Sequence, residues 1–554
     1  MPQDAFTLRH VAAELEKKLL GGKISKINMP ERDELSLIIY TRSGSVKLEI
    51  SSSAKNNRIS LSSSEKPNPQ NAPNFCMLLR KHLQNAQITA IRQIAFERII
   101  AIDFDCFSEF STTEMTLYCE IMGKYSNMIL VEKGVILGAL KQTTLEENAR
   151  RVLFSGAKYT LPPPQGKADP TKLEELKKAM AGRRYDERQI CADIEGIAYS
   201  TAAEICASSG GDASAEEIYD YVTSDNIAPC VTFDEHGNPN DFKVRTVQQN
   251  AARHDDILSA QREYYDYVYI KKTFDDMSRR LSAAVRAAIK KVEKRLAQIQ
   301  EKLLECESAD EIKLKGELIT ANIYRLERGM TSFEADDYYS EQPKKIKISL
   351  DRQLTPAQNA QKYYKKYAKM KRTVEYLTVQ LSDEQGRLDY LTSIESSIAT
   401  AECTDDLRDV ESELTAEGLI KKAPERKKKM PEVTPMRQYE IEGFRVTAGR
   451  NNVQNDRLLK SLAPEDIWLH VNRFHSAHVG IAADGKDVPD EVIAKAAAIC
   501  AYYSQARGRD KVTVDYTRRK YVKKPPKANL GFVIYTDYSN IIVTPDPHRE
   551  CAKN

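Results

Sequence analysis

The sequence of 554 residues predicts a multidomain α+β protein. Its length exceeds what one hydrophobic core usually organises, because domains commonly hold about 100–200 residues. Segments that alternate apolar and polar residues, as strands do, occur near both ends of the chain, and a heptad-like repeat occupies its middle. We therefore expect four units, at residues 1–170, 171–240, 241–430 and 435–554.

Residues 1–170 are expected to form a mixed α/β domain. The stretch FTLRHVAAELEKKLL has helical periodicity and ends at Gly21 and Gly22. Strand-like alternation follows in LSLIIYT, GSVKLEIS, RIIAIDFD, MTLYCEIM and NMILVEKGVILGAL. A run of prolines at Pro162, Pro163 and Pro164 closes this unit.

Short helices are expected between residues 171 and 240. The stretch DIEGIAYSTAAEICA places Gly196 between Ile194 and Ile197, just before a predicted helix. This pattern is typical of a helix-hairpin-helix turn, whose backbone amides at a helix N-terminus can face a phosphate. Such turns also occur in helical domains that bind nothing.

A long antiparallel coiled-coil hairpin is expected at residues 241–430. Apolar residues follow a 4-3 rhythm in a first arm at Val285, Ile289, Val292, Leu296, Ile299 and Leu303, and in a second arm at Tyr367, Met370, Val374, Leu377, Leu381, Leu388 and Leu391. A segment of strand character, KKIKISLD, lies between the arms and predicts a small subdomain at the tip. An arm of about 40 residues would span about 60 Å, which suits a spacer.

A last α/β unit is expected from Tyr439 onward, after a basic linker at residues 421–435. Its predicted strands are FRVTAG, DIWLHV, KVTVDYT, LGFVIYT and NIIVTP, and its predicted helix is DEVIAKAAAICAYYSQAR.

Composition narrows the class of protein and its partners. No apolar run of about 18 residues and no N-terminal signal segment is present, so we expect a soluble cytoplasmic protein that does not enter a membrane. The ten cysteines show no CxxC spacing and are expected to be reduced. The net charge of +3 conceals basic blocks at residues 421–429 and 507–527, which suit an anionic partner or are simply solvated.

Three histidines close to the only tryptophan invite a metal or RNA hypothesis. Structural zinc sites usually use four ligands, and no supporting cysteine or carboxylate pair accompanies His470, His475 and His478. Strand parity puts His470 on the face of Trp468, which favours packing or stacking on an RNA base. We expect no metal and no cofactor. The candidate RNA contacts here are Trp468, His470, His478, Arg518, Arg519, Lys520, Lys523 and Lys524.

Enzymatic motifs are missing from the sequence. GxxxxGK[ST], GxSxG and HExxH do not occur, and Pro2 alone is slight support for a DNA glycosylase or lyase, since no zinc finger accompanies it. The adjacent Glu97 and Arg98 read as an ordinary exposed ion pair, or as an arginine that contacts phosphate and a glutamate that orients it.

Seven segments that span the chain form a recognisable set: NFCMLLRKHL, FERI, EIMGKYSNMIL, GELITANIY, NAQKYYKKYAKMK, GRNNVQNDRL and DIWLHV. Together they resemble one family, the NFACT proteins of ribosome-associated quality control, called RqcH in bacteria and NEMF in eukaryotes, and also known as fibronectin-binding protein A. The resemblance implies the order NFACT-N, helix-hairpin-helix, coiled coil and NFACT-R.

The resemblance also implies a function. Family members bind the large ribosomal subunit obstructed by peptidyl-tRNA and recruit aminoacyl-tRNA, alanyl-tRNA in bacteria, for C-terminal tailing without mRNA. They act as adaptors and leave peptide-bond formation to the ribosome. The older name implies the alternative of a surface adhesin, which the missing signal segment and anchor oppose.

The family's tRNA-binding motifs can be carried over residue by residue. Its Asp-Arg pair falls on Glu97 and Arg98, so this chain departs at the acidic member. The neighbouring motif falls on Glu120, Ile121, Met122, Gly123 and Lys124. The family's Pro-Gly-Ser-His reads His-Ser-Ala-His at residues 475–478, which retains only His478 and puts the local turn in doubt.

Overall fold

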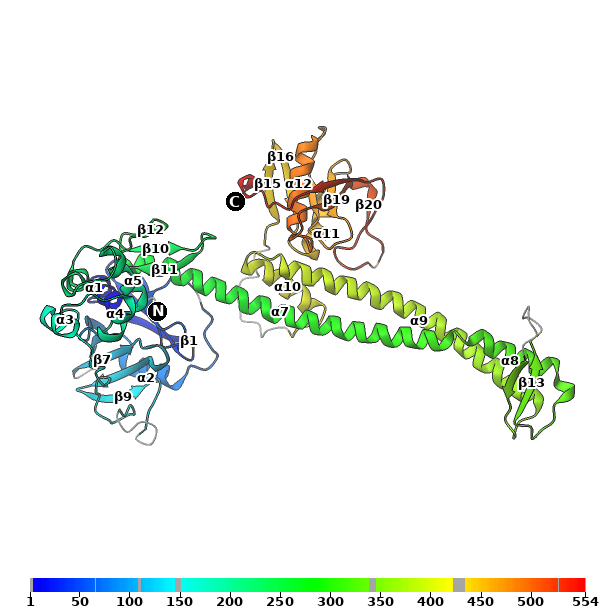
Figure 1. The fold of residues 1–554 in the computed structure, drawn as a ribbon, viewed down its shortest axis with the longest axis horizontal. Coiled ribbons are helices and arrows are strands. Elements are labelled where there is room, and N and C mark those ends of the chain that lie inside the picture. Colours follow the sequence, from blue (N-terminus) through cyan, green and yellow to red (C-terminus); the bar gives the residue numbers. More distant parts are fainter. Residues whose placement is uncertain are drawn as a thin grey trace. The chain divides into compact units, whose positions relative to one another are not determined.

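The computed structural model describes residues 3–64, 66–107, 111–144, 151–337, 345–421, 434–526 and 528–553. Pro2 and nearly all of the basic block at residues 421–429 lie outside this described part. The chain divides into two compact units, one of residues 1–271 and one of residues 272–554. Figure 1 follows the elements of each along the chain. No helix in the described ranges combines the length and the apolar character that crossing a bilayer requires.

A nine-stranded antiparallel sheet forms most of the first unit, in the order β4-β3-β2-β1-β5-β6-β7-β8-β9. The strands are β1 Lys23–Glu31, β2 Glu34–Thr41, β3 Gly44–Ser51, β4 Arg58–Leu61, β5 Gln87–Gln93, β6 Ile99–Phe107, β7 Thr112–Glu120, β8 Asn127–Glu132 and β9 Val135–Ala139. Helices α1 (Ala5–Leu19) and α2 (Asn74–Leu83) pack on this sheet and share its apolar core. The predicted mixed α/β character is confirmed.

The helical segment that follows packs on the same core. It contains α3 Leu173–Met180, α4 Glu187–Asp193, α5 Tyr199–Ser208 and α6 Ala215–Thr223. A small sheet of order β11-β10-β12 comes next, with β10 Cys230–Phe233, β11 Pro239–Lys243 and β12 Ala251–Arg253. The short helices were predicted, but this sheet was not.

The turn before α5 contacts the sheet domain through a glycine. Gly196 has φ +72°, and a Cβ on it would lie 2.6 Å from the Ala5 Cβ and 2.7 Å from the Phe96 carbonyl oxygen. Both the left-handed backbone and the close approach therefore require glycine here.

The side chain of Asp4 contacts the N-terminus of α5, where the sequence suggested that a phosphate could bind. One carboxylate oxygen of Asp4 accepts a hydrogen bond from the Thr7 amide at 2.9 Å and caps α1. The other accepts from the Ala198 amide at the start of α5, at 3.0 Å. This amide is therefore satisfied within the protein and is not available to a phosphate.

The predicted hairpin is present as α7 (Ile257–Cys306) and α9 (Pro356–Ala399), both longer than the expected 40 residues. Ion pairs join Arg286 to Glu395 and Arg295 to Glu384. A later residue of α7 thus pairs with an earlier residue of α9, which shows that the two arms are antiparallel. Side chains of the predicted seam are buried at Val285, Val292, Leu296, Ile299, Leu377 and Leu391.

Additional elements complete both ends of the hairpin. At the tip, α8 (Ala309–Ala321) and the strand pair β13 (Ser332–Asp336) and β14 (Lys345–Ser349) form a small core of their own. At the base, α10 (Thr404–Ala416) packs Leu407, Val410 and Leu414 against both arms. Helix α10 was not predicted.

The C-terminal part contains a seven-stranded antiparallel sheet of order β22-β19-β17-β18-β16-β15-β23. Its strands are β15 Arg437–Ile441, β16 Phe444–Ala448, β17 Ile467–Val471, β18 Val479–Ile481, β19 Val512–Arg518, β22 Ser539–Val543 and β23 Ala552–Lys553. Helix α12 (Asp490–Tyr502) packs on it, α11 (Asn452–Ser461) flanks it, and β20 (Val522–Lys523) pairs with β21 (Ile534–Tyr535). The predicted strand LGFVIYT shrinks to the two residues of β21.

Candidate RNA-binding sites

The two tRNA-binding motifs carried over from the family lie side by side in the first unit. Glu97 and Arg98 occupy the turn between β5 and β6. Strand pairing places Ile99 opposite Glu120, and the Ile121 amide donates to the Arg98 carbonyl at 2.8 Å. Segments about 20 residues apart in the chain therefore lie next to each other at this end of the sheet.

The β5–β6 turn has a constrained backbone. Ala95 has φ +50°, an uncommon conformation for a residue with a side chain. The Glu97 amide donates to the Ile94 carbonyl at 3.2 Å, and the Gln93 side chain donates to the Glu97 carbonyl at 2.9 Å. These bonds hold the partly buried side chains of Glu97 and Arg98 at the end of the sheet.

A second carboxyl group meets Glu97 from the turn before α5. Burial and a hydrogen bond with Glu97 raise the pKa of Glu195 to about 7, with smaller contributions from the charges of Glu97, Asp169 and Glu175. Two carboxylates cannot hydrogen bond unless one carries a proton. The pair is therefore expected to share a proton near neutral pH.

Glu120 is enclosed in the protein. Its side chain is 1% exposed and accepts two hydrogen bonds from Arg151, at 2.9 and 2.5 Å, and one from the Tyr159 hydroxyl at 3.0 Å. Burial and the Glu120 carboxylate raise the pKa of Tyr159. Glu120 thus holds the end of β7 in place, and its carboxylate is not available to a surface ligand.

The rest of this motif divides between the core and the surface. Ile121 is buried, Met122 is partly buried, and Gly123 has φ +60° at the start of the 3-10 turn Gly123–Tyr125. Lys124 is exposed, and its ammonium lies 4.9 Å from the ring centroid of Tyr125, whose side chain is 71% exposed.

The exposed ring of Tyr125 was missed by sequence reasoning. The sequence feature that could have indicated it is its position directly after the motif, next to Lys124. An exposed aromatic ring next to a cation can stack on a base while the cation meets a phosphate.

The tryptophan in the second unit does not present a surface to RNA. Trp468 is 0% exposed and packs with Leu459 and Val522, because both faces of β17 are covered. His478 is 1% exposed. The expectation of a base-stacking surface at Trp468, and of direct surface contact by His478, is therefore wrong.

Two of the three histidines, His470 and His478, pack with Trp468 in an aromatic cluster, and His475 lies outside it, partly buried. The ring centroids of Trp468 and His470 are 5.7 Å apart, and those of His470 and His478 are 5.5 Å apart. Burial lowers the pKa of His470 to about 4, and it also lowers the pKa values of His475 and His478. No group of side chains in the described ranges has the composition of a metal site.

Most of the predicted basic contacts are engaged within the protein. Arg518 and Lys520 both pair with Glu465, Lys524 pairs with Asp456, and Arg519 donates to the carbonyls of Leu459 and Val522. Lys523 is exposed. The two pairs with Glu465 are exposed and can exchange for phosphate at small cost.

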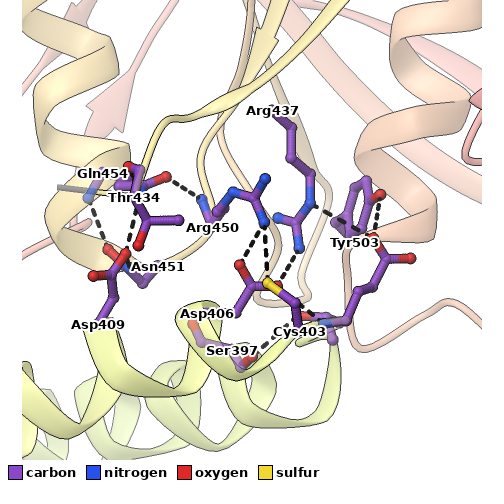
Figure 2. Close-up of polar contacts among 12 residues, drawn as sticks. Ser397, Cys403, Asp406, Asp409, Thr434, Arg437, Arg450, Asn451, Gln454 and Tyr503 are labelled. Carbon is purple, nitrogen blue, oxygen red and sulfur yellow. Dashed lines mark hydrogen bonds and ion pairs between the residues drawn. The ribbon is translucent and has the colours of Figure 1, made fainter. Parts of the chain in front are cut away.

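Two arginines of the second unit bind the acidic face of α10 (Figure 2). Asp406 is 2% exposed and accepts from Arg450 at 2.5 Å and from Arg437 at 3.1 Å. Arg437 also stacks over the Tyr503 ring at 3.9 Å. Burial opposes ionisation of Asp406, but the charges of the two arginines prevail and lower its pKa.

The neighbouring polar residues extend this contact. Gln454 donates to Asp409, and Asn452 donates to Glu413 and to the Ser393 hydroxyl. The GRNNVQNDRL segment thus fastens α11 to α9 and α10, which explains its polar residues structurally.

A cavity of about 630 Å³ lies beside this contact, between α9 and the C-terminal sheet. One wall carries serines of α9 and the Thr400 that caps it, and the other carries the three histidines with Arg473, Phe474 and the loop at residues 528–533. Sequence reasoning found the histidines but not the cavity, because the α9 wall lies about 80 residues away in the chain.

The fold defines a multidomain α+β protein with a long helical hairpin. Family models agree: NFACT N-terminal and middle domains match residues 4–432, and the NFACT protein RNA binding domain matches residues 435–534. The chain belongs to the NFACT family, which includes the RqcH proteins.

Curated relatives match along nearly the whole chain. It is 30% identical to the "Rqc2 homolog RqcH" of Streptococcus suis, over 98% of both chains, and 30% identical to that of Bacillus subtilis, over 96% of both. A solved structure of the N-terminal part of a Streptococcus suis fibronectin/fibrinogen-binding protein is 29% identical, covers 48% of this chain and 98% of its own, and has a TM-score of 0.43. The RqcH relatives and the matching RNA-binding domain support a role in ribosome-associated quality control.

Proposed function

We propose that this protein is a ribosome-associated quality control factor that acts in the cytoplasm. It binds large ribosomal subunits that carry an obstructing peptidyl-tRNA and recruits alanyl-tRNA for C-terminal tailing without mRNA. The ribosome forms the peptide bonds, and the protein supplies binding alone. The observation that carries this proposal is the direct pairing of the two tRNA-binding motifs through the Arg98 carbonyl and the Ile121 amide, in a chain with full-length RqcH relatives.

The chemistry of the first site suits a tRNA strand. Arg98 and Lys124 supply cations for phosphate, and Tyr125 supplies a ring for a base. Contacts of this kind release counterions, so we expect tRNA binding to weaken steeply as salt rises.

Affinity purification from cells tests the function as a whole. Tagged full-length protein purified at low salt should carry large-subunit proteins, 5S and 23S rRNA, and tRNA enriched in the alanine acceptor. Recovery free of ribosomal material, or recovery of both subunits with mRNA, would contradict the proposal.

Substitution of Arg98 tests the tRNA site. Arg98→Ala should remove tRNA from the purified complex and leave the large subunit bound, since it deletes the cation and not the hairpin. Arg92→Ala is the matched control, because Arg92 is an exposed arginine on the adjoining strand that pairs with Asp103. Loss of tRNA and subunit together in Arg98→Ala would mean that the first site is not a separate tRNA site.

Glu97 can be tested by the family's own residue. Glu97→Asp should keep tRNA binding within a few fold of the parent, because the charge is retained and moves by one methylene. A large loss would show that the glutamate is matched to its Glu195 partner in this chain.

A further inference from the structure

We propose that the cavity between α9 and the C-terminal sheet binds a single nucleotide, with the base inside and its phosphate at Arg473. This inference deepens the proposed RNA-binding function and rests on it. An unstacked nucleotide of an RNA strand and a free mononucleotide share this chemistry, and the experiment below separates them.

The cavity has the size and lining of a small-ligand site. Its volume of about 630 Å³ falls within the roughly 300–1,000 Å³ typical of ligand pockets. Aromatic rings of Phe474, Phe532 and Tyr535 line it, and Phe532 is 50% exposed. Such rings stack on any base without a hydrogen-bonding code.

A buried polar atom in the lining lacks a partner. His478 is 1% exposed, yet its Nδ1 makes no hydrogen bond to any described residue. The ring's other nitrogen bonds to the Gly531 backbone, and burial lowers the pKa of His478, so Nδ1 is a neutral acceptor. An orphaned acceptor of this kind suits an amino or imino group on a base edge.

Glycine holds the loop that fixes this ring. Gly531 has φ +75°, and a Cβ there would lie 2.6 Å from the Asn452 side-chain oxygen. Its amide donates to Asp456 at 2.9 Å, which anchors the loop from α11. The acceptor is thus held in a preformed position.

Arg473 supplies a cation at the edge of the cavity. It is exposed and lines the cavity, and within the described ranges its guanidinium has no hydrogen bond and no ion pair. Its φ of +60° is an uncommon and costly conformation for arginine. Two residues further on, the His475 amide donates to the Gln505 side chain, and the Gln505 amide donates to the His475 carbonyl, so the segment that follows Arg473 is held in place.

The single tryptophan provides a reporter for the test. Trp468 contacts three residues that line the cavity, with ring centroids 5.7 Å from His470, 5.2 Å from His478 and 5.0 Å from Tyr535. We would titrate the full-length protein with adenosine monophosphate, with a five-residue oligoadenylate and with inorganic phosphate, and record fluorescence excited at wavelengths where only tryptophan absorbs. Both nucleotide probes should give a saturable change, and phosphate alone should not.

A cavity-filling substitution controls the location. Ser397 lines the cavity from α9, and its hydroxyl donates to the carbonyl four residues earlier. Ser397→Leu should abolish the fluorescence change without unfolding the helix, since leucine has the better helix propensity. Ser412→Leu is the matched control, because this exposed serine of α10 makes the same bond and lies outside the cavity.

Removal of the cation tests the phosphate end. Arg473→Gly accommodates the left-handed backbone and should weaken nucleotide binding about tenfold. If Ser397→Leu binds like the parent, if phosphate competes as well as the mononucleotide does, or if no probe changes the fluorescence, the proposal is overturned. If the oligoadenylate binds more tightly than adenosine monophosphate, the natural ligand is a nucleotide of an RNA strand. If the mononucleotide binds more tightly, the natural ligand is a free mononucleotide.

The outcome is distinguishable from failure of the proposed function. Arg98→Ala should leave the tryptophan response intact, because that residue belongs to the other unit. A protein that carries large subunits and tRNA but shows no response would lose the cavity proposal alone.

Discussion

Single carboxyl groups are expected to decide how the proposed tRNA site responds to solution conditions. Glu97 and Glu195 come from different segments and share a hydrogen bond, while Glu120 is committed to Arg151 and Tyr159. The Glu97–Glu195 pair is sensitive to pH because its two carboxyl groups share a proton that can be lost. The other is a buried ion pair, in which loss of the cation is costly.

The carboxyl pair predicts a pH dependence of tRNA binding. Burial and the neighbouring glutamate raise the pKa of Glu195 to about 7, so the shared proton is present below that pH and lost above it. Loss places two negative charges beside Arg98, the proposed phosphate contact. We expect tRNA affinity to fall as pH rises from about 6 to 8, and Glu195→Gln, which cannot ionise, to flatten that profile. An unchanged profile in Glu195→Gln would assign the dependence elsewhere.

Arg151 predicts a stability effect on the first unit. Arg151→Ala leaves the buried carboxylate of Glu120 without its cation, which we expect to cost about 3–5 kcal/mol. Thermal unfolding followed by circular dichroism measures the loss. Arg92→Ala removes an exposed ion pair and should change stability by at most about 1 kcal/mol. Equal effects of the two changes would contradict the burial argument.

At the scale of elements, the hairpin depends on a narrow apolar seam. Ile394 is 0% exposed and belongs to the core where α7, α9 and α10 meet. The exposed faces carry ion pairs such as Arg286 with Glu395, which contribute little. The arms are therefore held by packing.

Ile394→Ala should destabilise the second unit by about 2–5 kcal/mol, because it leaves a cavity where three helices pack. Val379→Ala is the matched control on the same helix, since Val379 is 62% exposed and should change stability by at most about 0.5 kcal/mol. Urea unfolding followed by Trp468 fluorescence measures the stability of this unit. Coincident unfolding curves for the two variants would contradict the conclusion that the apolar seam holds the arms together.

The hairpin and most strands could be predicted because their periodicity is local. Helix α10 could not be predicted in this way, because it has few apolar residues and its buried Asp406 pairs with arginines about 30 to 45 residues later in the chain. Likewise, the alternating pattern predicted strand β17. It did not predict that Leu459 and Val522 pack on the second face of this strand and bury Trp468. The tRNA motifs came from resemblance, and their joining at Arg98 and Ile121 required the strand register.

At the scale of the molecule, the chain comprises two compact units, and helix α7 contains the boundary between residues 271 and 272. Each unit has its own apolar core. Because the only tryptophan lies in the second unit, its fluorescence reports that unit, whereas circular dichroism averages over both units.

We therefore expect unfolding in urea to be non-two-state, with a fluorescence transition that does not coincide with the one seen by circular dichroism. Arg151→Ala should shift only the latter, since it alters only the first unit. Superimposable transitions in both proteins would show that the two units unfold as one.

The double cap made by Asp4 has a consequence for the protein's own synthesis. Its carboxylate bonds to an amide 194 residues later, and the glycine that closes on Phe96 is made almost as late. At about 5–20 residues per second, roughly 10–40 seconds separate the two partners during translation. A factor proposed to act on stalled translation thus cannot complete its own proposed tRNA site until more than a third of its chain has been translated.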